Sequence, residues 1–169
     1  MQTNGQAREK RIFSENRLKL QRCSPRGALQ ALRASPLVDL GLIYALRSLA
    51  ESVAARANFH LQLDLPEKIG GLPPEVEQVF YRTAQEALTN ILEHAGARMV
   101  QVSLLQAADG LVLTVSDDGR GFNPENMDDQ NQLGLVGMRE RAGMIGAVLK
   151  VDSQVEKGTT IRLAYRGEK

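Results

Sequence analysis

The chain has 169 residues, a length that suits one domain with a core, or one domain with a short appendage. Apolar residues make up 43% and charged residues 24%, which is ordinary for a globular protein and excludes a disordered class. No apolar run approaches the roughly 18 residues of a membrane span, and no apolar core follows the basic N-terminal residues as in a secretory signal. We therefore expect a cytoplasmic domain without membrane contact of its own, which is compatible with a membrane-anchored parent protein.

Cysteine and charge divide the chain further. The single cysteine, Cys23, excludes an internal disulfide and a zinc framework. Residues 1–35 hold eight Lys/Arg and two Glu, whereas residues 36–169 hold thirteen Lys/Arg and eighteen Asp/Glu. We predict a basic leader over 1–35, for which a solvated helical stem is favoured over a membrane-proximal or nucleic-acid-binding arm. The folded part over 36–169 is acidic, which argues against a nucleic-acid partner, because phosphate binding needs clustered cations.

The first half of the folded part predicts a helix, a strand and a second helix. After Pro36, apolar residues recur at helical spacing. They are Leu42, Leu46, Leu49 and Val53, with Ile43, Ala50, Ala54 and Ala57 beside them. Alternation over 59–65 predicts a half-buried strand with His60 on its solvent side. Pro74, followed by acidic residues, begins a long helix that runs to about Ala95.

The second half predicts two β-hairpins separated by a polar segment and a helix. Alternating residues flank an Asp109-Gly110 turn, and residues 148–151 and 159–165 are joined across Lys157-Gly158. Residues 123–132 hold one apolar side chain and predict a mobile polar lid, followed by a helix from about Leu135 to Ile145. The expected fold is an α/β two-layer sandwich, with helices on one face of a mixed, largely antiparallel sheet.

The stretch VSDDGRGF, residues 115–122, places two carboxylates where the third predicted strand ends. Because side chains alternate along a strand, Asp117 shares the inward side of Val115 and Asp118 lies on the other side. A buried acid needs hydrogen-bond donors, and the amino group of a base such as adenine is a suitable donor. Gly119 and Gly121 allow a sharp turn and a close approach of the backbone to a ligand. Alone, Asp-Asp-Gly is equally typical of an ordinary turn.

Polar side chains also form a stripe on the long helix. Glu86, Asn90 and His94 are spaced by four and therefore share one surface. The amide oxygen of Asn90 can coordinate Mg²⁺, and Glu86 can orient a water or accept a proton. A solvated helix face explains the same spacing, so the stripe alone decides little.

Two further signals complement Asp117. Gly134 and Gly137 are predicted at the N-terminus of a helix, where free backbone N–H groups form a phosphate site. Thr159 shares the inward side of Ile161 and Leu163 on the last strand, where its hydroxyl can help to hold a base. A turn followed by a β-branched strand is the plain alternative for Thr159.

Together, YRTAQEALTNILEHA, VSDDGRGF, GLVGMRERA and GTTIRL resemble the N, G1, G2 and terminal glycine-threonine boxes of the GHKL (Bergerat-fold) ATP-binding domain. That domain is shared by sensor histidine kinases, gyrase, the Hsp90 chaperone and MutL. The wording is most similar to the nitrate/nitrite-sensor and DesK-like histidine kinases, which also resemble this chain at LVDLGLIYAL. The resemblance covers roughly residues 36–165.

The resemblance implies Mg-ATP binding and transfer of the γ-phosphoryl group to a histidine on a dimerisation domain, then to a response regulator. By resemblance, Asp117 accepts from the adenine amino group, Asn90 and Glu86 serve the metal and the attack, and His94 approaches the phosphates. The remaining nucleotide contacts that it implies are Gly119, Gly121, Gly134, Leu135, Gly137, Met138 and Thr159. Positioning and charge neutralisation supply most of such catalysis.

The sequence departs from the family pattern in one respect. The family's H-D-x-x-x-Q acceptor segment is missing, since the only histidines are His60 and His94. The leader is a candidate remnant of a dimerisation helix, and we expect a monomeric domain that does not phosphorylate itself. The first hypothesis is therefore a kinase catalytic domain that needs an acceptor-bearing partner. The alternative is an anti-sigma-like serine kinase or a nucleotide-sensing module without turnover.

Overall fold

The computed structural model describes residues 35–107, 110–123 and 129–167. The leader over 1–34 with Cys23, residue Asp109 and residues 124–128 of the predicted lid lie outside the described residues. Residues 36–169 form one compact unit. No helix in the described ranges is long and apolar enough to cross a membrane.

Five strands form one mixed sheet in the order β1-β2-β3-β5-β4. Their bounds are β1 His60–Asp64, β2 Met99–Ala107, β3 Gly110–Asp117, β4 Val148–Ser153 and β5 Thr159–Arg166. β1 pairs with β2 in parallel, whereas β2 with β3, β3 with β5, and β5 with β4 are antiparallel. The predicted strand and both predicted hairpins are therefore confirmed.

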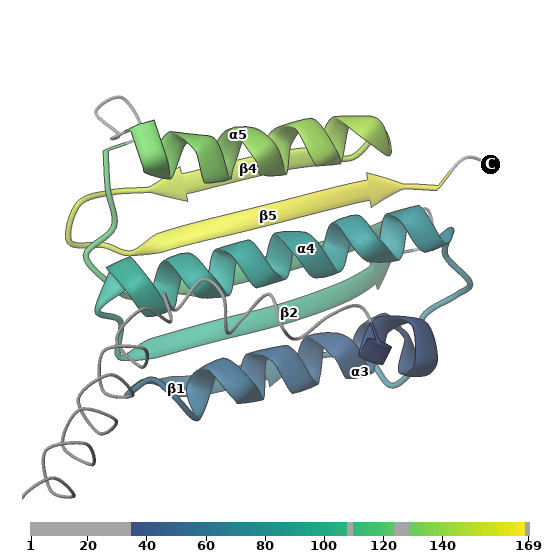
Figure 1. Ribbon diagram of the computed structural model, residues 1–169, viewed down its shortest axis with the longest axis horizontal. Coiled ribbons are helices and arrows are strands. Elements are labelled where there is room, and N and C mark those ends of the chain that lie inside the picture. The colour runs from purple at the N-terminus through teal and green to yellow at the C-terminus, as the bar shows by residue number, and fades with distance from the viewer. Residues whose placement is uncertain (1–34, 108–109, 124–128, 168–169) are drawn as a thin grey trace, which may run out of the picture. The chain divides into compact units, whose positions relative to one another are not determined.

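Within the described residues, the α-helices lie on one face of this sheet (Figure 1). They are α3, Ser35–Ala54; α4, Pro74–Asn90, which continues into the π-helical turn η2, Ile91–Ala95; and α5, Asp129–Met144. The arrangement confirms the expected α/β two-layer sandwich, with a largely antiparallel sheet.

The core lies between the two layers and follows the predicted periodicities. Alternate residues of β3 are buried, and the apolar stripes of α3 and α4 are buried with them. The largest fully buried side chains include Leu42, Leu46 and Val53 of α3, Phe80 and Leu88 of α4, Val100, Val102, Leu111, Leu113 and Leu163 of the sheet, and Met138 of α5. His60 is exposed, as its position on the outward side of β1 predicts.

Two helices differ from their predicted course. α3 is kinked at Gly41, where φ is +78°, a conformation that glycine adopts without steric cost. The long helix changes from α to π geometry at Ile91, although it ends at Ala95 as predicted. Neither the kink at Gly41 nor the π turn at Ile91 interrupts the apolar face of its helix, so the spacing of apolar residues does not predict them.

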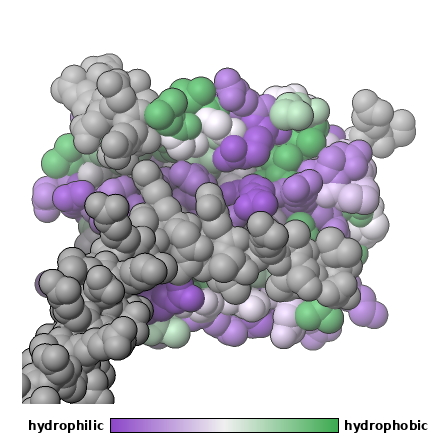
Figure 2. Space-filling model, in the orientation of Figure 1, coloured by the Kyte–Doolittle hydropathy of each residue, from purple (hydrophilic) through white to green (hydrophobic). Residues whose placement is uncertain are grey.

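The start of the last helix was predicted wrongly. α5 begins at Asp129 rather than near Leu135, so residues 129–132 are helical and not part of a lid. Its apolar residues are spread around the helix: Leu135 and Met138 are buried, whereas Leu133 is 71% and Met144 84% exposed. Hydrophobic residues interrupt the hydrophilic surface where α5 lies, along the upper edge of Figure 2. Without a clear apolar stripe, periodicity does not locate the first turn of this helix.

The end of β3 is fastened to the start of β2 by Asp118. Its Oδ1 accepts hydrogen bonds from the backbone N–H groups of Arg98 and Met99, both at 2.8 Å. Its own N–H donates to the carbonyl oxygen of Met99 at 3.2 Å. The bond from Met99 N–H, and then that from Arg98 N–H, lower the pKa of this carboxyl below its ordinary value of 3.8. Asp118 therefore fixes the strand end from which Asp117 projects.

We expect Asp118→Ala to lower the free energy of unfolding by about 1–2 kcal/mol at pH 7, because two backbone donors lose their acceptor. Since the folded-state pKa is lowered, the stabilisation is present above pH 3.8 and is lost as the pH falls through the folded-state pKa. Urea denaturation at several pH values measures this difference. The control is Asp152→Ala at an exposed position of β4, which should change stability by less than about 0.5 kcal/mol. A pH-independent difference would contradict this role for Asp118.

Candidate functional site

A pocket of about 270 Å³ lies at the end of the sheet where β3 ends and β5 begins. Its volume is near the lower end of the range for small-molecule sites, roughly 300–1,000 Å³. The lining residues come from α4, η2, β3 and its following turn, α5 and β5. They are Ala87, Asn90, Ile91, His94, Ala95, Val115, Asp117, Arg120, Gly121, Phe122, Leu135, Thr159 and Ile161.

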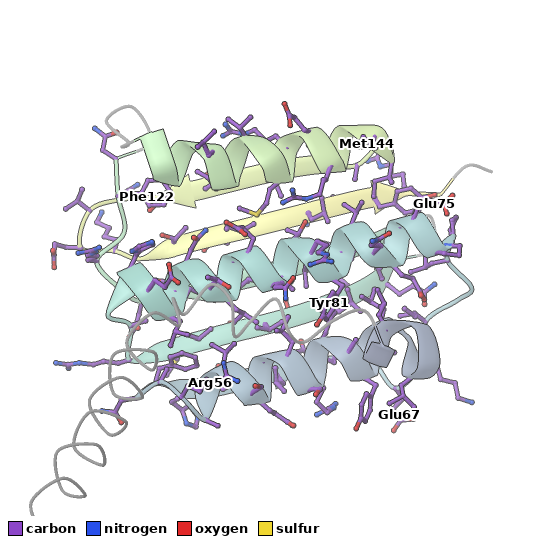
Figure 3. The ribbon with its side chains drawn as sticks, viewed as in Figure 1. Arg56, Glu67, Glu75, Tyr81, Phe122 and Met144 are labelled. Carbon is purple, nitrogen blue, oxygen red and sulfur yellow. The ribbon has the colours of Figure 1, made fainter. Side chains whose placement is uncertain are left out.

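Figure 3 orients this end of the molecule. Phe122, which lines the pocket, lies where the β4–β5 turn and the first turns of α5 meet. Glu75 at the start of α4 and Met144 at the end of α5 lie at the opposite end. α4 and α5 therefore run antiparallel over the sheet, and the end of one lies near the start of the other beside the pocket.

Asp117 is the half-buried acid of the pocket, on the inward side of β3 as predicted. Its Oδ1 accepts a hydrogen bond from the N–H of Gly119 at 2.8 Å. Burial raises the pKa of Asp117 above its ordinary value of 3.8, and the neighbouring Asp118 raises it further. Hydrogen bonds from the backbone N–H groups of Gly119 and Thr159 partly offset these effects. The carboxylate therefore has a cost of ionisation that a further donor from a ligand would reduce.

The two glycines after Asp117 serve close approaches within the protein. A Cβ at Gly119 would lie 2.5 Å from the carbonyl oxygen of Ala95 and 2.7 Å from the Ala95 Cβ. Arg120, the next residue, donates its N–H to the same carbonyl oxygen at 2.9 Å. Gly121 has φ of +55°, and the backbone of Gln154 occupies the place of its Cβ. Gly121 lines the pocket and Gly119 does not, and the expectation that both glycines approach a ligand stays a prediction.

Two residues of the polar stripe on the long helix line the pocket, and the third does not. Asn90, the last residue of α4, and His94 in η2 both line the pocket. Glu86, one turn earlier, does not line the pocket. Its Oε1 lies 2.7 Å from the position that a Cβ on Gly134 of α5 would take. Two of the three predicted catalytic side chains are therefore brought together, and the third lies against the neighbouring helix.

The predicted phosphate site at the start of α5 is not formed by its two glycines. Gly134 and Gly137 lie within α5, beyond the first turn that begins at Asp129, so their N–H groups are not those of a helix N-terminus. Leu135 lines the pocket, whereas Met138 is fully buried in the core. The predicted helix start is therefore wrong, whereas contact of these residues with phosphate stays a prediction.

The first residues of β5 complete the pocket. Thr159 and Ile161 both line it, on the inward side of the strand as predicted. Thr159 pairs with Asp117 of β3 on one side and with Ser153 of β4 on the other. The register of the antiparallel strands therefore brings the predicted acid and the predicted hydroxyl into one row.

Several pocket residues were missed by the sequence analysis. Val115 could have been found from its inward alternation with Asp117, since it lies two positions earlier on the same strand. Arg120 and Phe122 lie in the turn after β3, where alternation no longer predicts direction. Ile91 and Ala95 face the pocket from η2, and no local sequence signal announces a π-helical turn.

A mixed sheet covered by helices on one face, with a half-buried acid in a pocket at the strand ends, is the arrangement expected of a GHKL-type ATP-binding domain. A family model described as histidine kinase-, DNA gyrase B- and HSP90-like ATPase matches residues 75–168. The chain belongs to this family.

Individual relatives narrow the comparison to sensor histidine kinases. The chain is 36% identical over 132 residues to the oxygen sensor histidine kinase NreB of Staphylococcus carnosus (strain TM300), covering 78% of this chain and 38% of NreB. The histidine kinase domain of the Erythrobacter litoralis EL346 blue-light activated histidine kinase superposes with a TM-score of 0.63 and 25% identity, covering 74% of this chain and 60% of that one. A second structure of that kinase has a TM-score of 0.60 and 24% identity, covering 77% and 46%, and supports the fold. The chain thus spans less than two thirds of these relatives.

We expect Gly119→Ala to lower the free energy of unfolding by about 1–3 kcal/mol, because the new methyl group would lie within 2.7 Å of the carbonyl oxygen and Cβ of Ala95, so the backbone must shift. The control is Gly143→Ala in α5, where nothing lies within 4 Å of the new Cβ. That control should stabilise the protein by about 0.5–1 kcal/mol, because alanine favours a helix interior over glycine. Chemical denaturation measures both, and equal stabilities for the two variants would contradict the tight contact at Gly119.

Proposed function

We propose that this domain binds Mg-ATP in the pocket at the ends of β3 and β5 and transfers the γ-phosphoryl group to a histidine of a separate phosphoacceptor domain. The phosphoryl group would then pass to a response regulator, as in a cytoplasmic two-component pathway. The single observation that carries this proposal is the half-buried Asp117 carboxylate, placed in a pocket that also contains Asn90. The membership of the chain in the family and its similarity to NreB support the proposal.

The base-binding part of the proposal rests on the surroundings of Asp117. Val115 and Ile161 give this part of the pocket apolar walls, which suit the faces of a purine ring. Asp117 accepts from Gly119 through one oxygen and retains further acceptor capacity for a ligand. An exocyclic amino group donates to it, whereas the carbonyl oxygen of guanine would place acceptor against acceptor. Adenine is therefore the base that fits.

The phosphate-binding part rests on Asn90 and His94, which line the same pocket from α4 and η2. Mg²⁺ is commonly held by one or two protein oxygens together with phosphate oxygens and waters, and the Asn90 amide oxygen fits that requirement. The ion would neutralise phosphate charge, and His94 would approach the phosphate chain. Glu86 would support the metal or the attacking group from the next turn of α4, where it now contacts α5 at Gly134.

The acceptor histidine is assigned to a partner. His60 is exposed at the start of β1, and neither His60 nor His94 lies in an H-D-x-x-x-Q segment. His94 lines the pocket itself, where it would contact the donor nucleotide. We therefore assign the phosphoacceptor to a dimerisation domain that is supplied to this one.

We expect ATP to bind more tightly than GTP in the presence of Mg²⁺, and Asp117→Asn to weaken ATP binding by about 1–3 kcal/mol, the usual cost of disturbing a buried polar contact. Titration calorimetry with both nucleotides measures this. The matched control is Asp152→Asn, at an exposed position of β4 outside the pocket lining, which should leave the ATP affinity within about threefold of the native value. Equal affinities for ATP and GTP would refute adenine recognition by Asp117.

Phosphoryl transfer is tested by mixing the protein with radiolabelled Mg-ATP and a phosphoacceptor domain from a related histidine kinase. We expect an acid-labile, base-stable product on the acceptor, and a loss of at least about tenfold in rate for Asn90→Ala because the metal contact is removed. An acid-stable product would indicate transfer to serine instead. ATP binding without transfer to any acceptor would indicate a nucleotide-sensing module and would contradict the kinase assignment.

A further inference from the structure

Ser153, the last residue of β4, lies behind the pocket and makes three side-chain hydrogen bonds. Its Oγ accepts from the N–H of Phe122 at 2.9 Å, donates to the carbonyl oxygen of Gly158 at 3.1 Å, and is 2.9 Å from the Oγ1 of Thr159. Thr159 lines the pocket, and Ser153 does not. Because Ser153 does not line the pocket, it can influence the pocket only through the residues to which it is hydrogen-bonded.

The direction of the third hydrogen bond follows from counting protons. A serine hydroxyl has one proton to donate and two lone pairs to accept with. Phe122 N–H can only donate, and the Gly158 carbonyl can only accept, so the single Ser153 proton goes to Gly158. All three hydrogen bonds form at the same time only when Thr159 donates its own proton to Ser153. The Thr159 oxygen is left with lone pairs alone for the pocket.

The surrounding backbone holds this arrangement in place. Antiparallel pairing aligns Asp117, Thr159 and Ser153 across three neighbouring strands. Gly158 has φ of +79°, and the Asp117 carbonyl lies where its Cβ would be, so the turn before Thr159 is packed against the end of β3. The carbonyl that takes the Ser153 proton is therefore part of a backbone with little freedom to move.

We propose that Ser153 is a positioning residue that turns the Thr159 proton away from the pocket, so that Thr159 and Asp117 together present acceptors to the bound group. This inference rests on the proposed function, because it assigns the base-recognising end of the ATP site. A ligand group at this end must carry N–H donors, as the amino group of adenine does. A base with a carbonyl oxygen at the same place meets two acceptors.

The test compares ATP with inosine 5′-triphosphate, in which a carbonyl replaces the adenine amino group. In the native protein ATP should bind much more tightly. In Ser153→Ala, the Thr159 hydroxyl loses its acceptor and becomes free to donate into the pocket, so it can satisfy the inosine carbonyl. The ratio of the two affinities should therefore fall by about 3- to 10-fold, the effect of one neutral hydrogen bond. An unchanged ratio in Ser153→Ala would overturn the proposal.

Three further variants separate positioning from a general loss of structure. Ser153→Thr retains the hydroxyl and should retain the native ratio. In a Thr159→Val background, Ser153→Ala should change the ratio no further, because Ser153 acts through Thr159, and a full additional drop would contradict this. Ser116→Ala removes a hydroxyl on the other side of β3 and should leave the ratio unchanged.

The Thr159→Val variant keeps the proposal testable if Ser153→Ala does not fold. Thr159→Val alone removes an acceptor, so it should weaken ATP and leave inosine 5′-triphosphate unchanged or tighter. An equal loss for both nucleotides would overturn the assignment of Thr159 as an acceptor. If the native protein binds neither nucleotide, the proposed ATP site itself is refuted. When Ser153→Ala does fold and binds ATP, an unaltered ratio of the two affinities refutes the role of Ser153 alone.

Discussion

The site depends on keeping one carboxylate half-buried at the end of β3. Desolvation opposes the ionised form of Asp117, and the raised pKa of this carboxyl reflects that opposition. The N–H of Gly119 offsets part of the cost, and it can do so because glycine permits the turn to lie directly against Ala95. Under the proposed function, a donor from the bound ligand would offset the rest of the cost, and the burial of Asp117 would favour ligands that carry such a donor.

Asp117 and Asp118 show how strand geometry gives opposite tasks to adjacent, identical residues. Alternation directs Asp117 inward and Asp118 outward, where it binds the backbone of Arg98 and Met99. The pKa of the first carboxyl is raised, chiefly by burial, and that of the second is lowered, chiefly by the hydrogen bond from Met99. Asp118 holds the end of β3 against the start of β2, and this contact fixes the backbone that carries Asp117. Neither role would survive a shift of register by one residue, because such a shift would exchange the two faces.

Sequence patterns predicted those parts of the fold that depend on burial along one element. Alternation located the strands and the inward direction of Asp117 and Thr159, and helical spacing located the buried faces of α3 and α4. Patterns failed where a contact between elements decides the structure. The kink at Gly41, the π-helical turn after Asn90 and the first turn of α5 leave no periodic signal. The contact of Glu86 with α5 and the hydrogen bond from Phe122 to Ser153 join residues distant in the sequence, so no local pattern predicts them.

The two ends of the pocket are built from different kinds of element. At the Asp117 end, the groups lie on three strands in fixed register, with glycine turns packed against their neighbours. Sites on paired strands hold their geometry closely. Under the proposed function, the base would therefore meet a site that is already formed. At the other end, Asn90 and His94 lie across the change from α to π geometry, and Glu86 contacts α5 rather than the pocket. That end lacks the pairing that fixes the first. Under the proposed function, phosphates and Mg²⁺ would join Asn90 and His94, which line the pocket, with Glu86, which does not.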